Sequence, residues 1–275
     1  MTASITSEST SDILQISDSL RKVEIGNTAP YEFIDTASVL SGVLDILHGL
    51  PTVPPSIFID LEGENLSRHG TISILQIHVL PLKRTYLIDL YTLDETAFSV
   101  TGARGQTLKQ ILESSKIPKV IFDVRNDSDA LYKHFNIRLA GMQDLQLMEV
   151  ATRSFGRKHV NGLAKCIERD ASLSAAERQR WKDCKETGIR LFAPERGGSY
   201  KVFNHRPMSK EILQYCVQDV HFMPRLWAYY NGKMTPQWHQ RAEIESKERV
   251  KLSQSPSYVS HGPHKALAPR GWLYL

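Results

Sequence analysis

Four carboxylates follow one another along the chain in settings that could bring them round one point. Asp60 and Glu62 belong to the strand-like run SIFIDLEGENL, Asp129 to NDSDALYKHF, and Asp219 to the helical stretch EILQYCVQDVHF. Tyr215 lies four residues before the last of them. Mg²⁺ prefers oxygen ligands and shares its coordination sphere with substrate phosphates. The set therefore predicts metal-assisted hydrolysis of phosphodiester bonds.

The first two acids share one side of a predicted strand. Alternate residues of a strand point to the same face, so Asp60 and Glu62 lie together while Ile59 and Leu61 face the other way. Two carboxylates on one face of an apolar strand repel each other unless a positive charge lies between them. This pattern favours a bound cation over a solvated strand end.

The third acid comes from the segment after the predicted strand KVIFDV. Asp123, Asp127 and Asp129 all lie near that point. Asp123 would close the strand, and Asp127 or Ser128 fits a helix N-cap, whose side chain binds backbone amides. Asp129, expected in the first helical turn, is therefore the preferred ligand, and Asp123 and Asp127 stay open as alternatives.

The fourth acid and the tyrosine fit one face of a helix, because residues four apart lie one turn from each other. Asp219 would then bind a metal while the Tyr215 phenol holds water or a phosphate oxygen. A tyrosine four residues before an aspartate is a weak signal alone, and Tyr31 with Asp35 repeats it in a strand-like setting. Tyr215 by itself equally fits a core aromatic. The specificity comes from the ordered combination.

The elements that must position these residues can be read from the alternation of β-branched and amphipathic runs. Predicted strands are YEFID, SIFIDLEG, TISILQIHV, TYLIDL, KVIFDV and a short one near residues 139–144, and predicted helices are TASVLSGVLDIL, TLKQILESS and DSDALYKHF. Short turns join the second, third and fourth strands, which predicts antiparallel neighbours. From Val160 onward the pattern is almost wholly helical. The fold class is therefore α/β, with a mixed sheet flanked by helices and a helical C-terminal part.

Composition and charge permit this chemistry without specifying it. The chain has 275 residues, of which 41% are hydrophobic and 23% charged, and a net charge of +4, which favours a polyanionic partner only weakly. We expect a flexible arm over residues 1–30 and a globular domain over residues 31–233. Residues 234–275 predict a charged helix and a loosely ordered tail, and whether that tail binds substrate or a partner is open.

The cysteine pattern and the termini bear on the compartment. Three cysteines without a CxxC spacing fit a reducing environment better than a disulfide framework. The first residues show neither a signal-peptide nor a transit-peptide pattern. The longest apolar run is broken by Asp45 and His48, so no transmembrane segment is expected. These features favour a cytoplasmic or nuclear protein with no membrane partner.

One basic and aromatic stretch, residues 177–207, could bind single-stranded nucleic acid. Cations contact phosphates, and aromatic faces stack on bases. The alternative is a solvated helix followed by an ordinary loop, because acidic residues are interspersed. The residues expected to contact substrate are Arg180, Arg190, Arg196, Lys201, Tyr200 and Phe203.

Three separated motifs carry a resemblance to a known family. They are IDLEGENLSRHGTISILQI, RNDSDAL and LFAPERGGSYKVFNHRPMSKEILQYCVQD. Over residues 31–233 the sequence resembles the DEDDy-type 3′–5′ exonucleases of the DnaQ-like, RNase H-like superfamily. It is most similar there to RNase D relatives and the Egalitarian-like group. A histidine-bearing sister branch would have His where this chain has Gln214, which supports the tyrosine branch.

The resemblance implies an RNase H-like sheet and a metal-dependent 3′–5′ exonuclease acting on single-stranded nucleic acid, RNA more than DNA. It implies two ions, Mg²⁺ or Mn²⁺, held by Asp60, Glu62, Asp129 and Asp219, with Tyr215 helping to aim the attacking water. The product would be a nucleoside 5′-monophosphate. The alternative is a weakly active or inactive nucleic-acid-binding adaptor on the same fold. Loss of an acid is its usual sign, and none is missing. Oligomeric state and pathway stay open.

Overall fold

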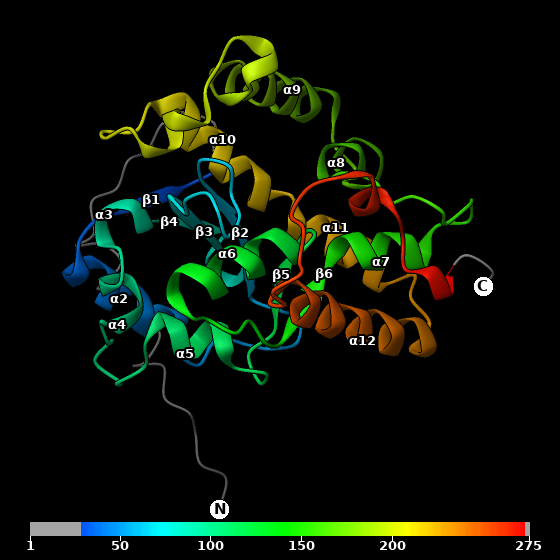
Figure 1. Ribbon diagram of the computed structural model, residues 1–275, viewed down its shortest axis with the longest axis horizontal. Coiled ribbons are helices and arrows are strands. Elements are labelled where there is room, and N and C mark those ends of the chain that lie inside the picture. The colour runs from blue at the N-terminus through cyan, green and yellow to red at the C-terminus, as the bar shows by residue number, and fades with distance from the viewer. Residues whose placement is uncertain (1–28, 273–275) are drawn as a thin grey trace, which may run out of the picture.

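Figure 1 shows the computed structural model of the chain, which describes residues 29–272. The expected N-terminal arm, residues 1–30, lies outside the described residues except for its last two positions. Within the described range six strands form one sheet: β1 (Tyr31–Ile34), β2 (Ile57–Glu62), β3 (Ile74–Val79), β4 (Arg84–Asp89), β5 (Lys119–Ile121) and β6 (Met142–Asp144).

The sheet has the order β1-β4-β3-β2-β5-β6. β2, β3 and β4 run antiparallel in succession, as the short turns between them require. β5 pairs in parallel with β2, β6 with β5, and β1 with β4. The predicted mixed sheet is thus confirmed, and it places β2 in the interior of the sheet between β3 and β5.

Helices lie on both faces of the sheet (Figure 1). Those that precede β6 are α2 (Ala37–Leu47), α3 (Leu90–Leu93), α4 (Thr96–Ser99), α5 (Leu108–Glu113) and α6 (Arg125–Phe135). Those that follow it are α7 (Leu145–Thr152), α8 (Leu163–Asp170), α9 (Ala175–Phe192), α10 (Lys210–His221), α11 (Met223–Asn231) and α12 (Pro236–Ser253). α2, α5 and α6 pack on one face, and α7, α10 and α11 cover the other.

The two sides of β2 have different roles. Ile59 and Leu61 are buried in the cluster under α2 and α5, which removes their apolar surface from water. Phe58, on the opposite face, packs against α7 and α11. Asp60 and Glu62 continue that second face toward the end of the strand, as the period of two predicts. The sheet thus presents both acids to α10.

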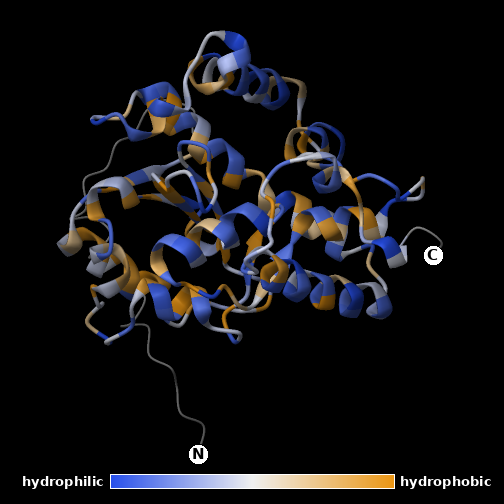
Figure 2. Cartoon of the chain, in the orientation of Figure 1, coloured by the Kyte–Doolittle hydropathy of each residue, from blue (hydrophilic) through white to orange (hydrophobic). Residues whose placement is uncertain are grey.

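The C-terminal part is more closely attached than its composition predicts. α9 is mostly hydrophilic (Figure 2) and packs on α10. α12 packs on α6, α7 and β6. Residues 254–272, expected as a loosely ordered tail, return to the core, where Val160 N donates to Ala266 O at 2.9 Å and Ala268 N to Lys158 O at 3.1 Å. Over the described range, no helix combines the length and the hydropathy needed to cross a membrane.

Candidate metal centre

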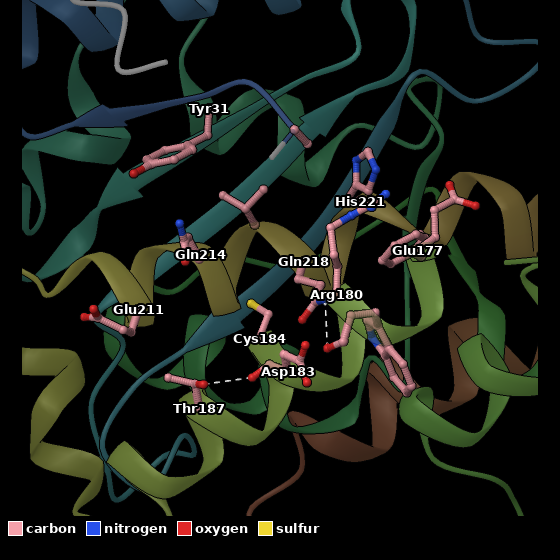
Figure 3. A pocket seen from close by; sticks show the side chains of 14 residues that line it. Tyr31, Glu177, Arg180, Asp183, Cys184, Thr187, Glu211, Gln214, Gln218 and His221 are labelled. Atoms are coloured by element: carbon pink, nitrogen blue, oxygen red, sulfur yellow. Dashed lines mark hydrogen bonds between the residues drawn. The ribbon is translucent and has the colours of Figure 1, made fainter. Parts of the chain in front are cut away.

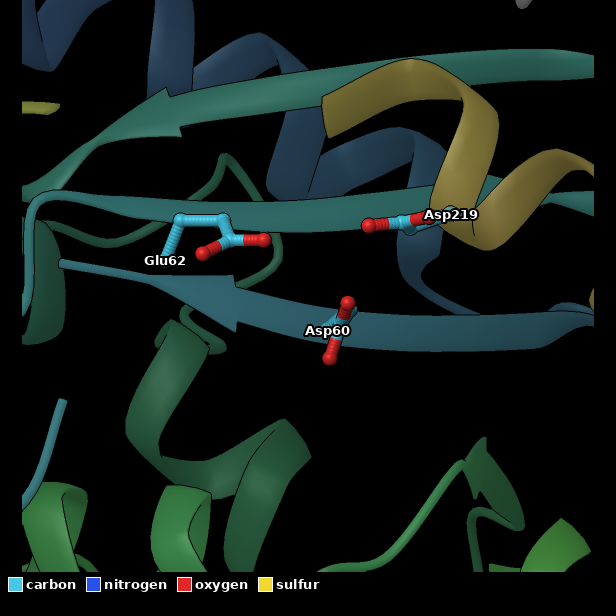
Figure 4. A group of neighbouring side chains, drawn as sticks. All are labelled: Asp60, Glu62 and Asp219. Atoms are coloured by element: carbon cyan, nitrogen blue, oxygen red, sulfur yellow. The ribbon is translucent and has the colours of Figure 1, made fainter. Parts of the chain in front are cut away.

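Three of the expected acids meet above the end of β2. Ligand oxygens of Asp60, Glu62 and Asp219 all lie within 4.8 Å of one another. Figure 4 shows the first two on the strand and Asp219 reaching toward them from α10. Oxygen donors at this separation can share one divalent cation, and Mg²⁺ takes such carboxylate sets. The structure therefore brings together residues from segments more than 150 positions apart.

These acids line a cleft of about 470 Å³ that other polar groups enter. Tyr215 lies one helical turn before Asp219 on α10 and lines the same cleft. Lys185 of α9 places its Nζ 3.5 Å from Asp219 Oδ1 and 5.2 Å from the centre of the Tyr215 ring. The cleft thus holds a cation beside the acids, and an ammonium group in such a place can bind an anionic ligand.

The Tyr215 side chain is packed closely against α9. It is 7% exposed, and the Phe192 ring meets it edge-on at 5.0 Å between centroids. A Cβ at Gly188 of α9 would lie 2.5 Å from Tyr215 Cδ2, so this close approach of α9 requires glycine. Burial, followed by the charges of Asp219 and Glu62, holds the pKa of Tyr215 well above its usual range. The phenol therefore stays protonated and can donate a hydrogen bond.

The third acid of the cleft is Asp127, and the expectation for Asp129 is corrected. Asp127 lines the cleft, whereas Asp129 does not. The Asp129 carboxylate is buried and bound by Arg68, through Nε at 2.6 Å and the backbone N at 2.8 Å. α6 begins at Arg125, so Asp127 lies in its first turn and Asp129 about 200° further round the helix axis.

A contact distant in sequence explains the early start of α6. Asp144, at the end of β6, accepts hydrogen bonds from the backbone N of Asp123 at 2.9 Å and of Val124 at 3.3 Å. It also caps α7 through Gln146 N. Because Asp144 binds amides just before the helix, no side chain of Asp127 is needed as a cap. That carboxylate is left free to enter the cleft.

Asp123, the other alternative, also lines the cleft but is occupied by cations. Arg125 binds both of its oxygens, at 2.5 and 2.6 Å, and Arg249 Nη1 lies 3.6 Å from Oδ1. Burial acts to raise the pKa of Asp123, but the hydrogen bond from Arg125 and the charge of Arg249 hold it below its usual value. Asp127 differs, because within residues 29–272 its buried Oδ1 has no hydrogen-bond partner.

The free acids of the cleft carry unfavourable electrostatics that a cation would relieve. Burial raises the pKa of Asp60 well above its usual value, and the charges of Asp127, Glu62 and Asp219 add to the shift. Burial and the charge of Asp219 raise the pKa of Glu62 in the same way. The pKa of Asp127 rises to about 7, mainly through burial. Mutually repelling, under-bonded carboxylates of this kind fit a divalent metal site.

These shifts predict that metal affinity rises with pH. Because the metal displaces protons from the raised carboxyls, we expect the affinity for Mn²⁺ to increase roughly 10- to 100-fold between about pH 5.5 and about pH 8, measured by calorimetric titration. The affinity should stop rising above about pH 7, where Asp127 has lost its proton. Asp127→Asn should reduce the dependence of the Mn²⁺ affinity on pH. An affinity independent of pH would contradict a site built from these groups.

The same groups predict a pH dependence of metal-free folding. The folded-state pKa values of Asp60, Glu62 and Asp127 exceed those of the unfolded chain, so the folded protein binds more protons. Their contribution to the free energy of unfolding is therefore complete below the ordinary carboxyl range and is lost as the pH rises through about 7. Chemical denaturation in EDTA at several pH values measures this loss.

The expected substrate-binding residues do not form one surface. Arg180 lines a separate cavity of about 520 Å³ between α9 and α10 (Figure 3). Arg190 and Arg196 are exposed and lie near Glu186, at 3.0 and 3.9 Å. Arg190 and Arg196 therefore belong to a solvated ion-pair group with Glu186. Arg180 lines a cavity other than the metal cleft.

The aromatic residues of that stretch are largely structural. Phe203 is 1% exposed and packs on Phe192, with 5.4 Å between ring centroids, so it offers no free face to a base. This corrects the expectation that Phe203 contacts substrate. Tyr200 is half-buried and stacked on Phe192 at 5.8 Å. Lys201 is exposed.

A known family matches most of the chain. Residues 31–234 match the family model described as 3′–5′ exonuclease. A mouse (Mus musculus) protein, piRNA biogenesis protein EXD1, is 38% identical over 89 residues, and its human (Homo sapiens) counterpart shows the same identity over the same length. That match covers 32% of this chain but only 14% of the mouse protein and 16% of the human one.

Solved structures share the fold. RNase D of Trypanosoma brucei, in a complex with RNA U12, superposes with a TM-score of 0.70 at 21% identity, covering 88% of this chain and 77% of that one. The same enzyme without that RNA gives a TM-score of 0.69 at 24% identity, covering 88% and 80%. NrnC of Brucella melitensis with bound Mg²⁺ gives 0.52 at 16% identity, covering 84% and 98%. The likeness supports the RNase H-like fold predicted from the sequence.

Proposed function

The chain belongs to the 3′–5′ exonuclease family, and on this premise we propose that it removes nucleotides stepwise from the 3′ end of single-stranded nucleic acid, RNA in preference to DNA. The observation that carries the proposal is the convergence of Asp60, Glu62 and Asp219 within 4.8 Å, beside Asp127 in one cleft. An adaptor without catalysis has no need of four acids that repel one another.

The acids are proposed to hold two divalent ions, Mg²⁺ or Mn²⁺. Asp60, Glu62 and Asp219 form the group with the shortest separations, and Asp127 enters the cleft from α6 on its other side. Ions bound there would lower the pKa of an attacking water and stabilise charge on the leaving 3′ oxygen. In this proposal Asp60, Glu62 and Asp219 have the role expected from the sequence, and Asp127 takes the place of Asp129.

Two neighbouring groups act on the substrate directly in this proposal. The protonated Tyr215 phenol donates a hydrogen bond that orients water or a non-bridging phosphate oxygen. Lys185 offers its ammonium group to the same phosphate, because it lies beside both Asp219 and the tyrosine ring. Hydrolysis at the terminal phosphodiester would release a nucleoside 5′-monophosphate.

The preference for RNA is supported by the relatives. The fold matches RNase D of T. brucei, which is described in a complex with RNA U12, and a segment of the chain matches a protein named for piRNA biogenesis. We also propose that residues 31–233 form the catalytic domain. Residues 234–275 would then be an appendage that packs on it through α12.

A degradation assay tests the function. Single-stranded RNA and DNA of the same sequence, labelled at the 5′ end, are incubated with the protein and Mg²⁺, Mn²⁺ or EDTA. We expect a ladder of products shortened one nucleotide at a time from the 3′ end, faster for RNA, and none in EDTA, because the free acids cannot activate water without metal.

The possible outcomes separate the parts of the proposal. Faster shortening of DNA would overturn the RNA preference and leave the exonuclease. Internal cleavage, with no ladder from the 3′ end, would contradict the exonuclease itself. Binding of RNA without any shortening in either metal would favour the adaptor.

A further inference from the structure

The C-terminal segment, residues 255–268, is called the C-terminal wall here because it contributes Lys265 to the lining of the metal cleft, although it lies beyond the residues that match the family. Tyr258 OH donates to Asn126 Oδ1 at 2.8 Å, and Arg125 Nη2 donates to the Lys265 carbonyl at 2.9 Å. Both bonds attach the segment to the first turn of α6, which also carries Asp127.

Lys265 extends from this wall into the cleft. Its Nζ donates to Asn126 Oδ1 at 2.7 Å and to Tyr258 OH at 2.9 Å, both uncharged partners. An ammonium group has three donors, so two are used and one is left for a ligand. Burial lowers the pKa of Lys265 to about 8, which leaves it mostly cationic at neutral pH.

The position of Lys265 complements that of Lys185. These two are the cations among the described residues that line the cleft, where five acids also lie: Asp60, Glu62, Asp123, Asp127 and Asp219. Lys185 lies beside Asp219, while Lys265 lies beside the first turn of α6. A strand that passes between α9 and α6 would thus meet one cation on each side.

A purely structural role does not account for this placement. Asp123, whose charge acts on Lys265, is already bound by Arg125 and approached by Arg249. The wall is held independently by backbone bonds at Ala266 and Ala268. The lysine side chain therefore lines the cleft on the side of Asp123 and Asp127, while two neutral groups orient its ammonium group by hydrogen bonds.

We propose that Lys265 is a substrate-binding residue that contacts a backbone phosphate near the 3′ end of the nucleic-acid strand. The inference rests on the proposed function for the identity of the ligand. It assigns part of the substrate site to the C-terminal segment, and Tyr258 and Asn126 act as positioning residues that hold the ammonium group.

Equilibrium binding tests this without requiring turnover. Wild type, Lys265→Gln and Lys265→Arg are titrated into a fluorescent single-stranded RNA in Ca²⁺, and anisotropy is followed at several salt concentrations. We expect Lys265→Gln to raise Kd about tenfold. The slope of log K against log salt should fall by about 0.7, which corresponds to one lost phosphate contact. Lys265→Arg should stay within about twofold of wild type.

The matched control is Lys251→Gln, which removes the same charge from an exposed position on α12. It should leave Kd and the salt slope unchanged. An unchanged Kd and salt slope in Lys265→Gln would overturn the proposal. Thermal unfolding of each variant tests for a structural role, and a loss of stability in both Lys265→Gln and Lys265→Arg would also overturn the proposal. Tight binding by wild type without 3′ shortening in Mg²⁺ would overturn the exonuclease and leave the Lys265 contact standing.

Discussion

Asp60→Asn is expected to lower the rate of 3′ nucleotide release by about a thousandfold or more, equivalent to about 4 kcal/mol of transition-state stabilisation. Asp60 belongs to the group of three acids within 4.8 Å, and the amide removes the negative charge that the metal requires while keeping the size of the side chain. Single-turnover rates on labelled RNA at saturating Mg²⁺ measure the loss.

The same change should stabilise the metal-free protein. The pKa of Asp60 is raised by burial and by three neighbouring acids, so this carboxyl opposes folding at neutral pH. We expect the free energy of unfolding in EDTA to rise by about 1 kcal/mol. In Mg²⁺ the wild type alone should gain stability, because ligands that bind only the folded state stabilise it.

The matched control is Glu95→Gln, an exposed carboxylate that makes no side-chain cap at the start of α4. It should change neither activity nor the response to Mg²⁺. An Asp60→Asn protein that is destabilised in EDTA, or that retains wild-type rates, would show that the acids are structural and do not bind metal.

Asp127→Asn and Asp129→Asn should have opposite effects, although the two residues are separated by one position. Asp127 lines the cleft with an unbonded oxygen, so its loss should lower kcat about a hundredfold or more without reducing the free energy of unfolding. Asp129 is 1% exposed and paired with Arg68, so its loss should reduce the free energy of unfolding by about 3 kcal/mol. Folded Asp129→Asn should keep kcat within a few-fold of wild type.

To compare Asp127→Asn with Asp129→Asn, kcat is measured at saturating RNA, and the free energy of unfolding is measured by denaturant titration. Arg68 also donates to the carbonyls of Ser253 and Ser255, both at 2.8 Å, so its release could loosen the C-terminal wall and raise KM. A loss of kcat in Asp129→Asn with normal activity in Asp127→Asn would restore the assignment made from the sequence.

Local regularities in the sequence determined several elements of the site correctly. The strand period of two placed Asp60 and Glu62 on one face and Ile59 on the other, because that alternation depends only on backbone geometry. The helical period likewise placed Tyr215 one turn before Asp219. Short turns were sufficient to predict the antiparallel order of β2, β3 and β4.

Contacts distant in sequence decided the rest. The start of α6 depends on amides bound by Asp144, about twenty residues away, and a cap of that kind leaves no trace in the local pattern that favoured Asp129. Phe203 is buried because Phe192 packs on it from another helix. Neither contact can be read from the local pattern, because each depends on how two separate elements pack together.

The two lysines that line the cleft were likewise identified by the tertiary structure and not by the sequence pattern. Lys185 was one of many basic residues in a charged stretch, and Lys265 belonged to a tail without periodicity, so composition could not separate them from solvated lysines. The sequence by itself determined the fold class and the relative placement of Asp60 with Glu62 and of Tyr215 with Asp219, because strand and helix periods act over a few residues. Only the tertiary structure decided which aspartate joins the other acids in the cleft and which lysines line it, because the packing of α6, α9 and the C-terminal segment sets those distances.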